Sequence, residues 1–150
     1  MTAETQRVDG VVQRTRLAAY AWCEDGEAVL LVRIAPGEVN AGRWTVPGGG
    51  LAFGEDPEAG VVRELREEAG IEGRVEGLAG VRSRVREPAE TTSGHRVHAV
   101  GILFRVSPTG GTIRDEPDGS TDRAAWIPIA DLDSVGIDDR AAWARRVVGR

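Results

Sequence analysis

Alternating and continuous apolar stretches divide the chain into strand-like segments that are separated by turn residues. Residues 16–23 (RLAAYAWC) and 28–34 (AVLLVRI) are rich in side chains that favour strands. Asp25-Gly26, which lies between them, is a typical hairpin-turn sequence. The pattern therefore predicts two antiparallel strands near the start of the chain.

Four later segments also have strand-like patterns. They cover residues 43–46, 74–86, 96–106 and 124–127. Gly77 and Gly80 interrupt the second segment, because glycine weakens the interior of a strand, and Ser107-Pro108 are expected to end the third. The connecting stretches, including an acidic and Gly-rich one over 109–122, are expected to be loops.

Two helices are predicted, one in the middle of the chain and one near its end. The first runs from about Pro57 to Ala69, because Asp56 can cap the free N–H groups and Pro57 lacks only a donor that the first turn does not use. Gly70 suits the left-handed conformation that often follows a helix. The second helix is expected over residues 138–148.

The central helix has an apolar face and an acidic face. At about 100° per residue, Val61, Val62, Leu65 and Ala69 gather on the side that would face a core. Three glutamates share another side; these are Glu64, Glu67 and Glu68. Like charges three or four residues apart destabilise a helix by about 0.2–0.5 kcal/mol per pair. The glutamates are therefore either a solvated surface, with relief from neighbouring arginines, or ligands for a hard divalent cation.

Strands interleaved with two helices indicate an α/β protein with a mixed sheet between helices, an α/β/α sandwich. A length of 150 residues allows one domain with a sizeable core. We expect a flexible N-terminal arm over residues 1–14 and the folded domain over residues 15–150.

Composition excludes several classes of protein. The net charge of −5 argues against general nucleic-acid binding, which needs a basic footprint. No apolar run approaches 18 residues, so no membrane span is expected, and the polar N-terminus lacks an apolar signal core. With Cys23 as the single cysteine, a cytoplasmic location and a buried structural thiol are expected. All 19 basic residues are Arg, so phosphate recognition would rest on arginines, backbone N–H groups or metals.

The central motif resembles the signature of the Nudix hydrolase family, to which MutT-like enzymes belong. Its fixed positions are Gly49, Glu55, Arg63-Glu64, the apolar Leu65, Glu67-Glu68, Gly70 and the apolar Ile71. Residues 44–48 (WTVPG) resemble the strand that enters the motif, and residues 126–132 resemble the late strand and short helix of the family. The resemblance implies the same α/β/α architecture and hydrolysis of phosphoric anhydride bonds.

The resemblance also implies a metal site. Glu67 and Glu68 would be the principal ligands of Mg²⁺, with Mn²⁺ as a substitute, and the carbonyl of Gly48 a further ligand. Glu64 would be a ligand or the general base. Arg63 would orient the glutamates, paired with Glu55.

The general base stays open between a glutamate of the motif and an acidic residue of the later loop. Family members differ in this respect, and the loop over 109–122 contains four candidates; these are Asp115, Glu116, Asp118 and Asp122. We select Glu116 among them.

Substrate contacts are expected from arginines and glycines. Gly49 and Gly50 would let backbone approach a phosphate closely. Arg33 follows an apolar strand, where related enzymes often hold a phosphate. Arg82 and Arg84 alternate along one strand, together with Arg86, and form either a phosphate-binding wall or an exposed surface.

The expected function is Mg²⁺-dependent hydrolysis of a nucleoside diphosphate linked to another group. Nucleoside triphosphates come first, and ADP-ribose or a nucleotide sugar second. The partner would be a small nucleotide, without nucleic acid or membrane, and a homodimer is compatible with the family. The alternative is a regulatory Nudix-like domain that binds nucleotides without hydrolysis; such domains usually lack one of the glutamates that this chain retains.

Overall fold

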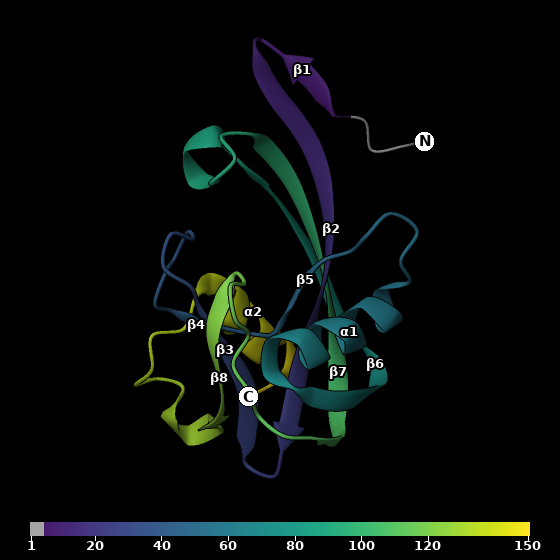
Figure 1. The fold of residues 1–150 in the computed structure, drawn as a ribbon, viewed down its shortest axis with the longest axis vertical. Helices are drawn as coiled ribbons and strands as arrows, with labels where there is room; N and C mark the ends of the chain where they lie inside the picture. Colours follow the sequence, from purple (N-terminus) through teal and green to yellow (C-terminus); the bar gives the residue numbers. More distant parts are fainter. Residues whose placement is uncertain (1–4) are drawn as a thin grey trace.

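A fifteen-residue strand, β2 (Val11–Asp25), forms the centre of a mixed sheet in the computed structural model, which describes residues 5–150. The other strands are β1 (Gln6–Val8), β3 (Ala28–Ile34), β4 (Trp44–Thr45), β5 (Gly48–Gly50), β6 (Ile71–Arg86), β7 (Arg96–Gly111) and β8 (Thr121–Pro128). The helices are α1 (Pro57–Ala69) and α2 (Asp139–Val148), with 3-10 turns η1 (Pro88–Glu90) and η2 (Ile129–Asp131). Figure 1 shows their arrangement.

The strand order is β4-β3-β2-β7-β6, with β1 and β5 paired to β2 and β8 paired to β3. β2 and β7 run parallel over eleven residue pairs, whereas β6 and β7 form a long antiparallel hairpin. β2 and β3 pair only beside their connecting turn, at Glu24–Val29 and Asp25–Ala28. Beyond that turn the two strands separate, and β5 pairs with β2 in the space that opens.

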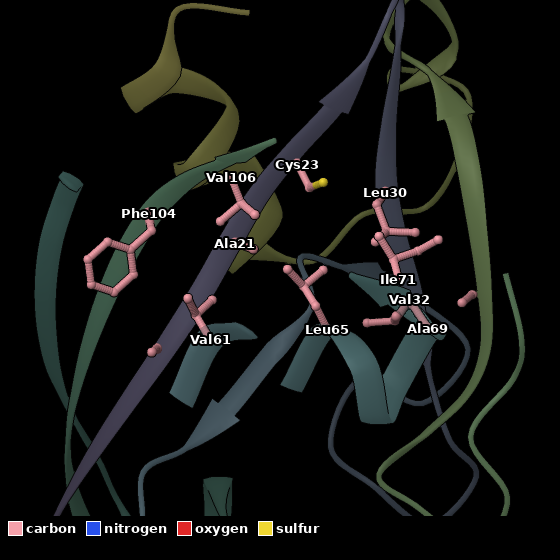
Figure 2. Close-up of a cluster of buried hydrophobic side chains, with 12 residues drawn as sticks. Ala21, Cys23, Leu30, Val32, Val61, Leu65, Ala69, Ile71, Phe104 and Val106 are labelled. Carbon is pink, nitrogen blue, oxygen red and sulfur yellow. The ribbon is translucent and has the colours of Figure 1, made fainter. Parts of the chain in front are cut away.

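The sheet lies between two apolar layers, because successive β2 side chains point to opposite faces. Ala21 and Cys23 pack with Val61 and Leu65 of α1 (Figure 2), and Ala19 belongs to the same cluster. On the other face, Tyr20 and Trp22 pack with three small residues of α2, which are Ala141, Ala144 and Val148. The predicted mixed sheet between helices is confirmed.

Local capping signals determine α1. The Asp56 carboxylate accepts a hydrogen bond from the N–H of Ala59 at 3.0 Å, and Pro57 occupies the first turn. Gly70 ends the helix with φ 72°, and its N–H donates to the carbonyl of Arg66. The predicted bounds, Pro57 to Ala69, are confirmed. Helix α2 begins one residue later than predicted, because Asp138 is its N-cap.

The long strands extend beyond the part of the sheet that the helices cover. β1, the start of β2, the end of β6 and the start of β7 form this extension (Figure 1). The segment expected to be a flexible arm therefore contains strand structure at 6–8 and 11–14, since these residues pair with each other and 13–14 also pair with β7. Residues 1–4 lie outside the described residues, and the flexibility of the arm stays a prediction.

Several predicted strand limits were wrong. β6 begins at Ile71 and not at residue 74, and β8 covers Thr121–Pro128, where a loop to residue 122 and a strand over 124–127 were expected. β7 continues past Ser107-Pro108 to Gly111, because the register with β6 shifts between Glu72 and Gly73, which lets Pro108 sit at an irregularity of the ladder. Gly48–Gly50 form a strand rather than a loop. In residues 5–150, no helix is both long and apolar enough to cross a membrane.

Candidate functional site

The glycine strand β5 brings the motif of the sequence against helix α1. Gly48 pairs with Tyr20 of β2, and its φ of 141° lies in a region that L side chains rarely adopt. The Gly48 N–H donates to Oε2 of Glu68 at 3.1 Å. This hydrogen bond fixes the acidic face of α1 against the glycine strand.

Arg63 connects the loop before α1 to the acidic face of the helix. Its Nε and Nη2 donate to the two carboxylate oxygens of Glu55 at 2.7 and 3.0 Å. Its Nη1 donates to Oε2 of Glu67 at 3.0 Å, and its Nη2 lies 3.2 Å from Oε1 of Glu64. Hydrogen bonds from Arg63 and from the Ala52 N–H lower the pKa of Glu55 to about 2. The expected pair of Arg63 and Glu55 is confirmed.

The three glutamates of α1 differ in exposure. Glu68 is 3% exposed, and the Glu64 side chain is 12% exposed, whereas that of Glu67 is 48% exposed. Burial raises the pKa of Glu68 well above its usual range, and the charge of Glu64 raises it further. Burial also raises the pKa of Glu64, while Arg63 lowers it. The site thus contains two carboxylates that lack the solvation a negative charge requires.

Glu116 lies near this acidic face, although it is about fifty residues away in the sequence. Its charge acts on both Glu64 and Glu68. Burial raises the pKa of Glu116, a hydrogen bond from the Thr121 hydroxyl at 3.3 Å lowers it, and the charge of Glu67 raises it. The structure therefore brings this loop residue together with the motif.

Two other acidic candidates have structural partners, and one of them, Asp122, lies in β8 and not in the predicted loop. Asp115 accepts a hydrogen bond from the Ala124 N–H at 2.9 Å, and Asp122 forms an ion pair with Arg33 at 2.9 Å. Asp118 has a positive φ of 57°. Glu116 is thus the loop carboxylate that stands in electrostatic contact with the motif.

The donor set fits a hard divalent cation. Its side chains are all carboxylates, and Glu68 is a buried one whose hydrogen-bond donor is a backbone N–H. Within residues 5–150, however, no three His, Cys, Asp or Glu side chains form a ready-made metal site. The ion pairs of Arg63 with Glu64 and Glu67 occupy oxygens that a cation would need. Metal binding therefore requires these carboxylates to rearrange, and the ligand set stays a proposal.

A cavity of about 360 Å³ opens beside β5. Gly48–Gly50, Glu64 and Glu68 line one part of it. Another part is lined by four arginines, which are Arg14, Arg16, Arg86 and Arg140. Sequence analysis missed Arg14, Arg16 and Arg140 as site residues. Alternation along β2 was the available signal, because Arg14 and Arg16 share a strand face with the buried Tyr20.

The three arginines selected from the sequence as substrate contacts lie outside the lining of this cavity, whereas Arg86, which alternates with two of them, lines it. Arg33 binds Asp122 through two hydrogen bonds, at 2.9 and 3.1 Å. Arg82 and Arg84 pair with Asp139 at 3.5 and 3.2 Å, and Arg84 also pairs with a second acidic residue, Glu90, at 2.8 Å. A substrate contact by any of the three would require these ion pairs to open.

Comparisons with known proteins agree with this geometry. The family model described as NUDIX domain matches residues 14–149. A "MutT-like protein" of Streptomyces ambofaciens is 35% identical over 104 residues, which cover 69% of this chain and 56% of the relative. A "Putative 8-oxo-dGTP diphosphatase 2" of Mycobacterium tuberculosis is 38% identical over 104 residues, 69% of this chain and 65% of the relative. The matched segments thus span less than two thirds of either relative.

Solved structures share the fold. The MutT NUDIX hydrolase from Burkholderia pseudomallei superposes with a TM-score of 0.74 at 25% identity, covering 90% of this chain and 98% of the other. Because nearly the whole of that chain is matched, the two proteins share their overall fold.

Proposed function

The chain belongs to the Nudix hydrolase family, and we propose that it hydrolyses the pyrophosphate link of a small nucleoside diphosphate derivative with a divalent cation. One observation carries the proposal. Glu68 is buried against the Gly48 N–H, beside the largely buried Glu64, and no basic side chain of residues 5–150 forms an ion pair with Glu68. A carboxylate in that position needs a proton or a cation, and an all-oxygen donor set suits Mg²⁺.

Each residue of the motif has a role in the proposal. Glu67, Glu68 and Glu64 would hold the cation, together with the carbonyl of Gly48. A bound divalent cation neutralises charge on phosphoryl oxygens and makes water more acidic. Arg63 would position the carboxylates, because it contacts Glu64 and Glu67 while anchored to a loop residue, Glu55.

Proton acceptance is assigned to Glu116, with Glu64 as the alternative. Glu116 belongs to a loop rather than to α1, so it can approach the attacking water from a different side than the motif glutamates do. Burial raises the pKa of Glu116, which makes its carboxylate a better proton acceptor than an exposed one. Gly49 and Gly50 would leave room for the phosphates, because they carry no side chain.

Nucleoside triphosphates are the first substrates to test, since one relative carries the name "Putative 8-oxo-dGTP diphosphatase 2". ADP-ribose and nucleotide sugars come second. The small-molecule partner, the cytoplasmic location and a homodimer also stay predictions.

The test compares the wild type with Glu67→Gln and Glu58→Gln in a substrate panel with Mg²⁺, with Mn²⁺ and with a chelator. Glu58 is an exposed glutamate at the start of the same helix, so its variant controls for the loss of one charge. We expect metal-dependent turnover that falls about a hundredfold or more in Glu67→Gln, the usual scale for losing one group that stabilises the transition state. Glu58→Gln should retain wild-type turnover.

If the wild type hydrolyses no substrate of the panel, with or without metal, the hydrolase proposal is refuted. If a nucleotide still bound tightly in that case, the regulatory alternative would replace it. Product analysis in ¹⁸O-labelled water would identify the phosphorus that water attacks.

A further inference from the structure

Arginines without carboxylate partners gather at one wall of the cavity. Nine of the nineteen arginines of this acidic chain form ion pairs within residues 5–150. The cavity-lining Arg14, Arg16, Arg86 and Arg140 form none with the described residues, and we call these four the arginine wall. They come from three separate elements, β2, β6 and α2, so the fold itself brings the charges together.

Arg86 is the most constrained member of the wall. Its Nε is buried and has no hydrogen-bond partner among the described residues. Burial lowers the pKa of its guanidinium, and the charges of Arg140 and Arg84 lower it further. A buried guanidinium nitrogen without an acceptor is costly, and Arg86 lines the cavity, where a bound anion would offset the charge of its guanidinium.

Aromatic and glycine neighbours hold two other members. The guanidinium of Arg140 lies over the ring of Tyr20, 4.3 Å from its centroid. A Cβ built on Gly50 would lie 3.2 Å from Nε of Arg16, so Arg16 rests directly on the glycine strand. These contacts restrain the guanidinium groups without neutralising their charge.

The glycine strand separates the arginine wall from the acidic face of α1. A Cβ on Gly49 would lie 2.9 Å from Oε1 of Glu64, whereas a Cβ on Gly50 would meet Arg16. Successive residues of a strand point to opposite faces. One cavity therefore offers a carboxylate group on one face of β5 and a guanidinium group on the other.

We propose that the arginine wall is an anion subsite for a phosphate that is not cleaved, so that preferred substrates carry a phosphate group beyond the hydrolysed link. The proposal rests on the proposed function, since it places the cleaved link beside the glutamates. Guanidinium forks suit phosphate oxygens, and four of them exceed the need of a single uncharged sugar. The phosphate could end a polyphosphate chain or be a monoester on the far part of the substrate.

The binding test uses inorganic tripolyphosphate in the presence of a chelator, so that it does not depend on metal or turnover. Isothermal titration of the wild type, Arg86→Gln, Arg16→Gln and Arg146→Gln gives the affinities. Arg146 is an exposed arginine of α2 outside the cavity and has no described ion-pair partner, so it is a matched control. Binding should weaken about 10- to 100-fold in Arg86→Gln and Arg16→Gln, the range for a charged hydrogen bond, and stay unchanged in Arg146→Gln.

A kinetic test distinguishes the two sources of the phosphate. ADP-ribose and ADP-ribose 2′-phosphate differ by one monoester, while ATP and adenosine 5′-tetraphosphate differ by one phosphate of the chain. The wild type should have the higher kcat/KM for the more phosphorylated member of at least one pair, and Arg86→Gln should reduce that preference towards none. The pair that responds identifies the source.

Unaltered tripolyphosphate binding in both wall variants, or no measurable binding by the wild type, would overturn the subsite. If Arg86→Gln fails to fold, Arg14→Gln at an exposed position provides the same test. The subsite and the proposed function fail separately. Turnover with normal binding in the wall variants removes only the subsite, and binding through Arg86 without any turnover removes only the hydrolase.

Discussion

Replacing Gly48 with alanine tests whether the glycine strand must lie against β2 to build the site. The new Cβ would collide with the Ala19 carbonyl oxygen and would lie 2.7 Å from the Tyr20 Cα, and both of these are backbone atoms that cannot turn aside. Gly54→Ala is the matched control. It too has a positive φ, 77°, but no atom lies within 4 Å of its Cβ.

The structure gives the size of the expected difference. Both substitutions place alanine at a positive φ, which costs about 1–3 kcal/mol. Gly48→Ala must also move β5 away from β2, to which it is joined by three residue pairs. Each ladder hydrogen bond contributes about 0.5–1.5 kcal/mol, and two or three of them would be lost. The free energy of unfolding of Gly48→Ala should therefore be about 1–4 kcal/mol lower than that of Gly54→Ala.

Urea and thermal unfolding of the metal-free variants would measure this difference. For a chain of this length, about 2–4 °C of Tm per kcal/mol is expected, so Gly48→Ala should melt roughly 2–16 °C below Gly54→Ala. It should also lose metal-dependent turnover, because the Gly48 N–H would no longer reach Glu68. Equal unfolding free energies for the two variants would refute the requirement for close contact between β5 and β2.

Two further predictions concern the core beneath the site. Leu65→Ala, at a fully buried position of α1, should lower the unfolding free energy by about 2–5 kcal/mol. Leu78→Ala is the control and should change it little, because that side chain is 62% exposed. Equal urea midpoints for the two variants would contradict the packing of α1. Burial raises the pKa of Cys23 to about 12. Its thiol should therefore resist iodoacetamide at pH 8 in the native protein and react after unfolding in urea, which mass spectrometry would measure. Rapid labelling of the native protein would contradict the burial of Cys23.

Short-range signals explain which parts of the fold the sequence predicts. The bounds of α1 follow from a capping aspartate, a first-turn proline and a terminal glycine, all within a few residues of the helix ends. The β2–β3 turn follows from Asp25-Gly26 in the same way. The strand character of Gly48–Gly50 has no local signal, because glycine disfavours strands and the partner residues of β2 lie about thirty residues earlier.

The arginines of the site also show that local sequence signals do not predict contacts with residues far away in the chain. The sequence predicts that Arg82, Arg84 and Arg86 share a strand face, and their pairing with alternate residues of β7 agrees with this. It does not predict which of them is neutralised. Asp139, which binds Arg82 and Arg84, follows them by more than fifty residues. The packing of α2 on this face brings Asp139 to Arg82 and Arg84, Glu90 adds a second partner for Arg84, and Arg86 forms no ion pair with the described residues.

The separation of β2 from β3 explains why opposite charges can meet in one cavity. Had the two strands paired along their whole length, no space would remain for β5. Because β5 consists of glycine alone, Glu64 and Arg16 both approach its backbone, one from each face. A side chain at Gly49 would displace the carboxylate, and one at Gly50 would displace the guanidinium. Gly49 is therefore required for the proposed cation site and Gly50 for the proposed phosphate subsite. Gly49→Ala should impair the cation site and spare the phosphate subsite, and Gly50→Ala should do the reverse.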